Sequence, residues 1–301
     1  MAAKRCGWRL AAETRPLGGL LHKPQMQLTE TLIHMYNRHR NRYAGLIICL
    51  LAILLVASIP TTVSSLSISP TYCQNVINGM VALTSGLQLP KYFLQENARK
   101  TGSEFDVNRY FSVLNHLSLP SGYTLDYFYF FGGIGGEPIL YARSSGQAPY
   151  QTRADYEAAN GKISLDEVQY KFIDSVQVDD TTEGFFQFIV LRTMGNQFYQ
   201  YWHAGYNDYR LICSDAGLDA LLSEANEYGP PLPLLVQIQA RLLNLTPSVE
   251  INIDTVRVQV MVFTKWGGFL RQTFTFNRHY PHTPIKVDAE TVIAYDWGVA
   301  Y

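Results

Sequence analysis

The sequence predicts an α+β fold, in which a mainly antiparallel β-sheet packs with several helices and one N-terminal transmembrane or signal-anchor helix precedes the folded part. Three observations carry this prediction. A charge-free apolar run lies near the N-terminus, and stretches with strand periodicity outnumber stretches with helical periodicity. Short turns join many of the strands, without the regular strand–helix alternation that builds a parallel sheet.

The apolar run defines the expected topology. No Asp, Glu, Lys or Arg occurs between Arg42 and Lys91, and residues 44–59 read AGLIICLLAILLVASI. Residues 1–42 hold eight Lys and Arg against two acidic residues, whereas residues 43–301 hold sixteen against twenty-three. A basic flank marks the cytoplasmic side of a membrane segment. A buried core helix also fits the length of the run, but such a helix is rarely apolar on every face behind a basic cluster.

We therefore expect four regions. Residues 1–42 form a basic cytoplasmic tail, unless translation starts at Met35, and residues 43–60 form a transmembrane or signal-anchor segment. Residues 61–71 read as a Ser/Thr/Pro linker, and residues 72–301 as an extracytoplasmic domain of a single-pass cell-membrane protein. The apolar run is longer than most signal-peptide cores and shorter than a full span. An uncleaved anchor is favoured, and cleavage to a secreted domain is the alternative.

The spacing of apolar residues predicts the helices and strands in the first half of this domain. Apolar residues at helical spacing predict helices over 76–87, 90–99 and 103–116, the last with a capping box formed by Ser103 and Asp106. Strict alternation from Tyr123 to Phe131 then predicts a strand apolar on both faces, and residues 139–143 supply its return partner.

The glycine cluster GGIGG at residues 132–136 lies between those two strands. A dinucleotide-binding loop that starts at Gly133 requires glycine at position 138, where the chain has Pro138, and it must be followed by a helix. Neither condition holds, so the cluster is expected to turn a hairpin. Glycine suits such a turn because it adopts positive φ without strain.

The second half is predicted to continue with strands and two further helices. The expected strands are 168–178, 185–193, 197–203 and 209–214, followed by helices over 215–229 and 234–244. A long hairpin, 250–264 with 269–277, turns at KWGG, and a last strand covers 285–295.

The candidate ligand face lies in FYQYWHAGYNDY, residues 198–209. Strand alternation places Tyr199, Tyr201 and His203 on one face, with Tyr206 in the next turn. Flat rings stack on the apolar faces of sugars, and short polar groups bind hydroxyls or amides, so this face suits a carbohydrate or peptide. A sheet face packed against a helix is the structural alternative.

Other chemistries find little support. In NRHYPHTP, residues 277–284, two histidines lie three apart, but Pro281 and Pro284 exclude the helix that would let them share a metal, so no metal site is expected. We expect a solvated turn, without catalytic function, at Asp179, Asp180 and Glu183. No cofactor motif occurs, and the acidic outer domain argues against nucleic acid as a partner.

Two of the four cysteines, Cys73 and Cys213, lie in the outer domain, where an oxidising compartment permits a disulfide. The sequence leaves the bridge open, since separated cysteines also serve as core residues.

The leading functional hypothesis is a membrane-tethered extracytoplasmic binding or interaction domain with an aromatic-rich face for a carbohydrate, a peptide or an envelope protein. An exported hydrolase acting on glycans or peptides is one alternative, and it requires titratable groups that converge in one pocket. A structural subunit of an envelope complex is the other, and it requires a flat apolar surface.

Overall fold

The structure, a computed structural model, describes residues 65–296 except 163, 202–208 and 228–230. All of them belong to a compact unit of residues 63–301, distinct from a unit of residues 1–62. The apolar segment 44–59 lies outside the described residues. Among the helices of the described part, none has both the length and the apolar character needed to cross a bilayer.

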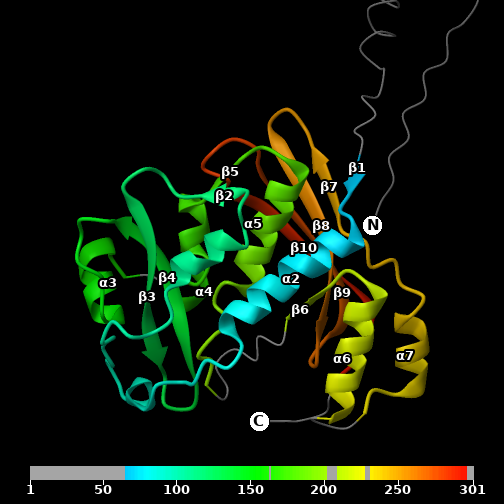
Figure 1. Cartoon of the computed structure of the whole chain (residues 1–301), viewed down its shortest axis with the longest axis horizontal. Coiled ribbons are helices and arrows are strands. Elements are labelled where there is room, and N and C mark those ends of the chain that lie inside the picture. The colour runs from blue at the N-terminus through cyan, green and yellow to red at the C-terminus, as the bar shows by residue number, and fades with distance from the viewer. Residues whose placement is uncertain (1–64, 163, 202–208, 228–230, 297–301) are drawn as a thin grey trace, which may run out of the picture. The chain divides into compact units, whose positions relative to one another are not determined.

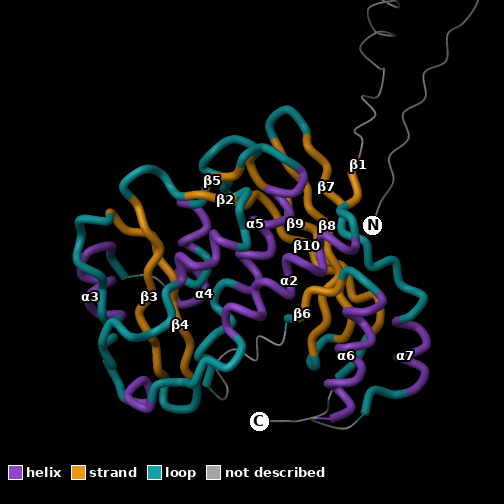
Figure 2. Tube along the Cα trace, in the orientation of Figure 1, coloured by secondary structure: helices purple, strands orange, loops and turns teal. Residues whose placement is uncertain are grey.

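The described chain has an α+β fold with antiparallel sheets, as the sequence predicts (Figures 1 and 2). Its strands are β1 Ser65–Ser67, β2 Leu117–Ser118, β3 Tyr123–Phe131, β4 Gly136–Ser144, β5 Gln177–Val178, β6 Arg210–Ile212, β7 Ser248–Ile251, β8 Thr255–Thr264, β9 Gly268–Asn277 and β10 Pro284–Ile293. Its α-helices are α2 Pro70–Thr84, α3 Arg153–Asn160, α4 Leu165–Val168, α5 Thr182–Met194, α6 Asp215–Glu227 and α7 Leu234–Ala240. Three 3₁₀ helices are η1 Lys91–Leu94, η2 Val107–Ser112 and η3 Lys171–Ser175.

A six-stranded antiparallel sheet in the order β1-β7-β8-β9-β10 forms the centre of the fold, and β6 pairs with β8 beyond the end of β7. Alternation along β8 divides its side chains between two cores. Val256, Val258, Val260 and Val262 face the main core with α5, whereas Met261 and Phe263 face a second core under α6 and α7. The predicted hairpin around KWGG is confirmed as β8 and β9, but its first strand begins at Thr255, because residues 250–251 belong to β7 and residues 252–254 turn the chain.

The segment 185–193, expected as a strand, is helical. Thr181 caps the N-terminus of helix α5, and its side chain accepts a hydrogen bond from the backbone N–H of Gly184. Residues 184–191 are all buried, because α5 contacts strands β7 and β8 on one side and helix α2 and the small strands β2 and β5 around it. A helix buried on every side has no polar stripe, so its run of Phe, Ile and Val resembles a buried strand in the sequence.

The β3–β4 hairpin lies across the helices from the large sheet, at the left of Figure 1. Its register is regular from Tyr123 opposite Ser144 to Phe131 opposite Gly136, and residues 132–135 form the turn. Gly133 has a φ of 83°, which favours glycine. The glycines therefore turn the chain, and no phosphate loop forms.

Three other expectations are corrected. Residues 168–178 form the end of α4, η3 and the two-residue β5 instead of one strand, because Phe172, Ile173 and Val176 are buried at helical spacing.

The expected helix 103–116 is reduced to η2, and its cap is Asp106, which accepts from the backbone N–H of Asn108. The fold also includes residues 65–71, assigned above to the linker, because β1 pairs with β7 through its backbone, which needs no apolar pattern.

Several helices end earlier than expected. The stretch 90–99 contains only the 3₁₀ turn η1, and the helix expected over 234–244 stops at Ala240. Short 3₁₀ turns carry too few periodic positions for their ends to be read from spacing.

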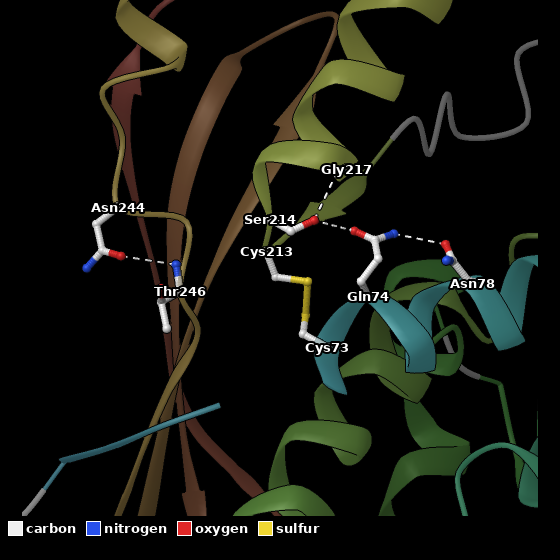
Figure 3. Close-up of a disulfide and its surroundings, with 8 residues drawn as sticks. All are labelled: Cys73, Gln74, Asn78, Cys213, Ser214, Gly217, Asn244 and Thr246. Atoms are coloured by element: carbon white, nitrogen blue, oxygen red, sulfur yellow. Dashed lines mark hydrogen bonds between the residues drawn. A yellow bond between two sulfur atoms is a disulfide. The ribbon is translucent and has the colours of Figure 1, made fainter. Parts of the chain in front are cut away.

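A disulfide joins Cys73 on α2 to Cys213 just before α6, across a sequence separation of 140 (Figure 3). Beside it, the Ser214 hydroxyl donates to the Gln74 side chain at 2.6 Å and accepts from the backbone N–H of Gly217. The Gln74 amide donates in turn to Asn78 at 2.9 Å. The bridge and this short chain of hydrogen bonds fasten α2 to the start of α6.

We expect removal of the disulfide by the double substitution Cys73→Ala and Cys213→Ala to lower the free energy of unfolding by about 2–5 kcal/mol, because the long closed loop restricts the unfolded chain. Urea unfolding of the full chain in detergent, with and without reductant, measures this change. Reductant should lower the wild-type midpoint to that of the double variant and leave the variant unchanged. Equal midpoints for oxidised wild type and variant would contradict the prediction.

Candidate functional site

Three chain segments that are distant in the sequence converge around one open hollow of about 430 Å³. They are residues 115–118 leading into β2, residues 177–180 in and after β5, and the β9–β10 loop at residues 278–282. Pairing of β2 with β5 brings the first two segments together. We call this concavity the His116 hollow, and its lining is mostly polar: Asn115, His116, Leu117, Ser118, Gln177, Val178, Asp179, Asp180, Arg278, His279, Tyr280 and His282.

His116 is held in a fixed orientation by its neighbours. Its Nδ1 lies 2.6 Å from Asp179 Oδ2, and its backbone N–H donates to Gln187 of α5 at 2.9 Å. The imidazole is 28% exposed. Since Nδ1 faces the carboxylate, Nε2 is the ring nitrogen that remains for a ligand.

Asp179 also belongs to the cap of α5. Its Oδ1 accepts from the Thr181 hydroxyl at 2.5 Å and from the Thr181 backbone N–H at 3.2 Å. Partial burial acts to raise the pKa of Asp179, but the hydrogen bonds from Thr181 and His116 outweigh burial and lower the pKa. The Thr181 hydroxyl donates to Asp179, accepts from the backbone N–H of Gly184, and also lies 3.3 Å from Nδ1 of His116.

Asp180 and Arg278 form the opposite wall through a bidentate ion pair. Arg278 Nε and Nη2 donate to the two carboxylate oxygens of Asp180 at 2.8 and 2.7 Å. These hydrogen bonds lower the pKa of Asp180. Arg278 Nη1 also donates to the carbonyl of Asn252 at 3.1 Å, so the guanidinium ties the hollow to the β7–β8 turn.

His282 forms the floor and is only 3% exposed. Its Nδ1 lies 3.1 Å from the carbonyl of Asn277, and its Nε2 accepts from the backbone N–H of Val178 at 3.3 Å. This arrangement requires the neutral ring with the proton on Nδ1. Burial lowers the pKa of His282, which keeps the ring neutral.

Tyr280 supplies an aromatic surface at the rim, with its side chain 46% exposed. An exposed ring beside hydroxyl, amide, carboxylate and imidazole groups can stack on an apolar face and bind hydroxyls. The wall carboxylates already accept hydrogen bonds from His116, Thr181 and Arg278, and their pKa values are lowered. Neither is suited to donate a proton as a general acid.

The residues of the predicted aromatic face are only partly described. Tyr199 has a φ of 49°, which breaks the expected strand, and only an isolated bridge links Tyr201 to Gly136. The alternation from which a common face was inferred is therefore absent at residues 199–201. His203 and Tyr206 lie outside the described residues.

Tyr199 and Tyr201 are both half-buried. The Tyr199 hydroxyl accepts from the backbone N–H of Phe105 at 3.2 Å, and its ring packs against Phe93 and Phe198. The ring of Tyr201 packs against Phe131. These contacts fit the structural alternative, and a ligand-binding role for these residues stays a prediction.

A second polar hollow, of about 400 Å³, lies beside the outer edge of β3. Asp126 in its wall is 9% exposed and is paired with both Lys100 and Arg143, the latter at 2.9 Å. The Asn108 side chain caps the strand edge by donating to the carbonyl of Leu125 and accepting from its N–H. The charges here satisfy one another, so the arrangement is structural in character.

Glu104 also lines this second hollow. Its carboxylate accepts from the backbone N–H groups of Thr101 and Gly102 and from the Tyr92 hydroxyl. Burial acts to raise its pKa, but these hydrogen bonds prevail and lower it to about 2. Like Asp179 and Asp180, Glu104 is therefore a firmly ionised carboxylate.

Local sequence patterns gave no sign that the loop 277–284 meets Asp179 and Asp180. The sequence indicated each as a separate polar loop, and Arg278 is 98 positions from Asp180. Among the described residues, no group of three His, Cys, Asp or Glu side chains is placed to hold a metal ion.

We expect His282 to make the domain less stable in mild acid. Its folded-state pKa is lowered by burial, so below about pH 6.5 the unfolded chain binds a proton that the folded chain does not. The stability that His282 contributes is complete above that pH and is lost as the pH falls toward the folded-state pKa. The lowered pKa values of Asp179 and Asp180 act only at a lower pH, below about 4.

Urea unfolding at pH 7 and pH 5 measures this loss. His282→Gln should cost about 1 kcal/mol at pH 7, as expected for an imperfectly replaced buried hydrogen bond, and should reduce the further loss at pH 5. His279→Gln, at an exposed position of the same loop, is the matched control and should keep the wild-type pH dependence. A full acid-induced loss in His282→Gln would show that another group is responsible.

Comparison with known proteins assigns no function to this site. No protein-family model, no curated protein and no solved structure matches the chain.

Proposed function

We propose that the described residues are the extracytoplasmic binding domain of a protein tethered to the cell membrane by residues 43–60, and that the ligand is a hydroxyl-rich molecule of carbohydrate type. The observation that carries the proposal is the His116 hollow, in which three segments place an exposed tyrosine beside polar groups held in fixed orientations. Carbohydrate sites combine these two features, since a ring covers the apolar sugar face and polar groups bind the hydroxyls.

Two further observations support parts of this proposal. The disulfide between Cys73 and Cys213 fits an oxidising compartment outside the cytoplasm. The lowered pKa values of Asp179 and Asp180 favour binding over hydrolysis in the His116 hollow, because a hydrolase of glycans needs one carboxyl that remains protonated near neutral pH.

The topology is tested by reporter fusions at the C-terminus. Alkaline phosphatase fused after Tyr301 is expected to be active, because that enzyme folds only outside the cytoplasm where its disulfides form. A reporter that works only in the cytoplasm should be inactive at the same position. The opposite pattern would show that the domain lies inside.

Ligand binding is tested with the full chain in lipid nanodiscs on an array of immobilised oligosaccharides. We expect at least one saccharide to bind, and Tyr280→Ala and His116→Ala each to weaken its binding by about 1 kcal/mol, roughly fivefold in Kd. Tyr123→Ala is the control, because that side chain is 50% exposed on the β3–β4 hairpin.

Equal loss in Tyr123→Ala, or wild-type affinity in both hollow variants, would contradict the assignment of the hollow. Incubation of bound saccharides with the protein separates binding from hydrolysis. Release of new reducing ends that depends on His116 would favour the hydrolase alternative.

A further inference from the structure

Arg192, in the last turn of α5, differs from the other arginines of the described chain. Arg99 and Arg109 are exposed to water. Seven others pair with Asp or Glu, namely Arg143, Arg153, Arg210, Arg241, Arg257, Arg271 and Arg278. Arg192 is half-buried, and its Nε is buried without a hydrogen-bond partner among the described residues. No described carboxylate acts on its charge.

The guanidinium of Arg192 lies over two aromatic rings. Its Cζ is 3.9 Å from the ring centroid of Tyr170 and 5.5 Å from that of Phe274 on β9. Such cation–π contacts offset part of the cost of taking the charge out of water. Burial lowers the pKa of Arg192, but a guanidinium keeps its proton in proteins. A buried positive charge therefore remains, and it is costly unless an anion neutralises it.

Arg192 lines a hollow of about 190 Å³, which we call the Arg192 hollow. Its other lining residues come from α5, β9, β10 and two loops: Tyr170, Thr193, Tyr209, Gln272, Phe274 and Val287. Val287 lies opposite Phe274 in the register of β9 and β10 and is 45% exposed, so the hollow is open at the outer strand. The two hollows share no lining residue, so this site is separate from the His116 hollow.

The composition of the lining indicates the class of ligand. Within the described chain, no Asp or Glu lines the Arg192 hollow, and its neutral polar groups include the Gln272 amide and the Thr193 hydroxyl. One cation with neutral hydrogen-bonding groups suits a single negative charge. The volume equals that of about six water molecules, so it holds a charged group with only a short carbon chain. The Phe274 and Val287 side chains provide apolar walls for that chain.

We propose that the Arg192 hollow binds a small free monocarboxylate, whose two oxygens accept hydrogen bonds from the guanidinium. The planar guanidinium matches the geometry of a carboxylate and can donate to both oxygens at once. Binding neutralises the charge at the C-terminal end of α5, so the ligand stabilises the domain. The site has its own residues, and the inference does not depend on the carbohydrate ligand proposed above.

The test measures the thermal unfolding midpoint of the full chain in detergent, followed by circular dichroism at constant ionic strength. A ligand that binds only the folded chain raises the midpoint. We expect propionate at a hundredfold excess over its Kd to raise the midpoint by about 5–10 °C. Propionamide, which has the same shape without the charge, should leave the midpoint unchanged. This comparison uses the wild type alone and needs no variant.

Two variants assign the effect to Arg192. Arg192→Met keeps a long side chain and removes the charge. Without ligand it should unfold at or above the wild-type midpoint, because an apolar side chain replaces an unneutralised charge, and it should not respond to propionate. Arg271→Met is the matched control, since that arginine is on β9 and pairs with Glu290, and it should keep the full response.

Four outcomes would overturn the inference. The first is an equal response to propionamide, and the second is a full response in Arg192→Met. The third is a response to chloride as large as that to propionate, which would indicate a general anion site. The fourth is tighter binding of the peptide Gly-Gly-Gly than of propionate, lost when its C-terminus is amidated, because the carboxylate would then belong to a peptide.

A further variant tests for a partner within the chain. Asp208 precedes Tyr209 in the sequence. If the wild type does not respond to propionate and Asp208→Asn lowers its midpoint, Asp208 is the counterion and the inference is wrong. An unchanged propionate response in Asp208→Asn supports a free ligand.

Discussion

Burial of helix α5 on every side is the constraint on which the rest of the described structure depends. Its phenylalanines fill the space between the large sheet and the smaller elements around it, with Phe188 5.1 Å from Phe276 of β9 between ring centroids and Phe186 6.4 Å from Tyr72 of α2. Because every face of α5 is occupied, the sheet, α2 and the β2–β5 pair all take their positions from one helix.

The same helix organises the His116 hollow. Gln187, which is 1% exposed, accepts from the backbone N–H of His116 and donates to Asn115 at 3.1 Å, so α5 holds one wall directly. The N-terminal cap residue Thr181 holds Asp179, and through it the His116 ring. A buried glutamine and a helix cap thus place an exposed polar surface, which links the packing of the core to the geometry of the site.

The sequence predicts those elements whose local pattern differs from their surroundings. The hairpins β3–β4 and β8–β9 alternate between two faces and turn at glycine clusters, and helix α2 has one buried stripe, so each is visible from spacing. Helix α5 could not be found in this way, because full burial removes the polar residues that define a helical period. Residues 197–203 show strand alternation that the positive φ of Tyr199 interrupts, and a backbone angle at a non-glycine residue leaves no sign in a residue pattern.

The candidate site was less accessible to sequence reasoning than the fold. The chemistry of His279, His282, Asp179 and Asp180 is visible in the sequence, but their convergence depends on the pairing of β2 with β5 and on the ion pair between Arg278 and Asp180. Contacts across such sequence separations depend on the tertiary packing, so no local pattern encodes them.

The disulfide has a mechanical consequence for a chain held at its N-terminal end. A force applied to the N-terminal end of the described chain first loads β1, which is joined to β7 by three residue pairs, and then the start of α2. Unravelling from that end stops at Cys73, because the covalent bond passes the load to Cys213. The β3–β4 hairpin, α5 and the segments of the His116 hollow up to Asp180 lie inside the closed loop and carry none of the force. Pulling on the N-terminal end of the described chain therefore extends it by only a few residues before the load reaches the disulfide.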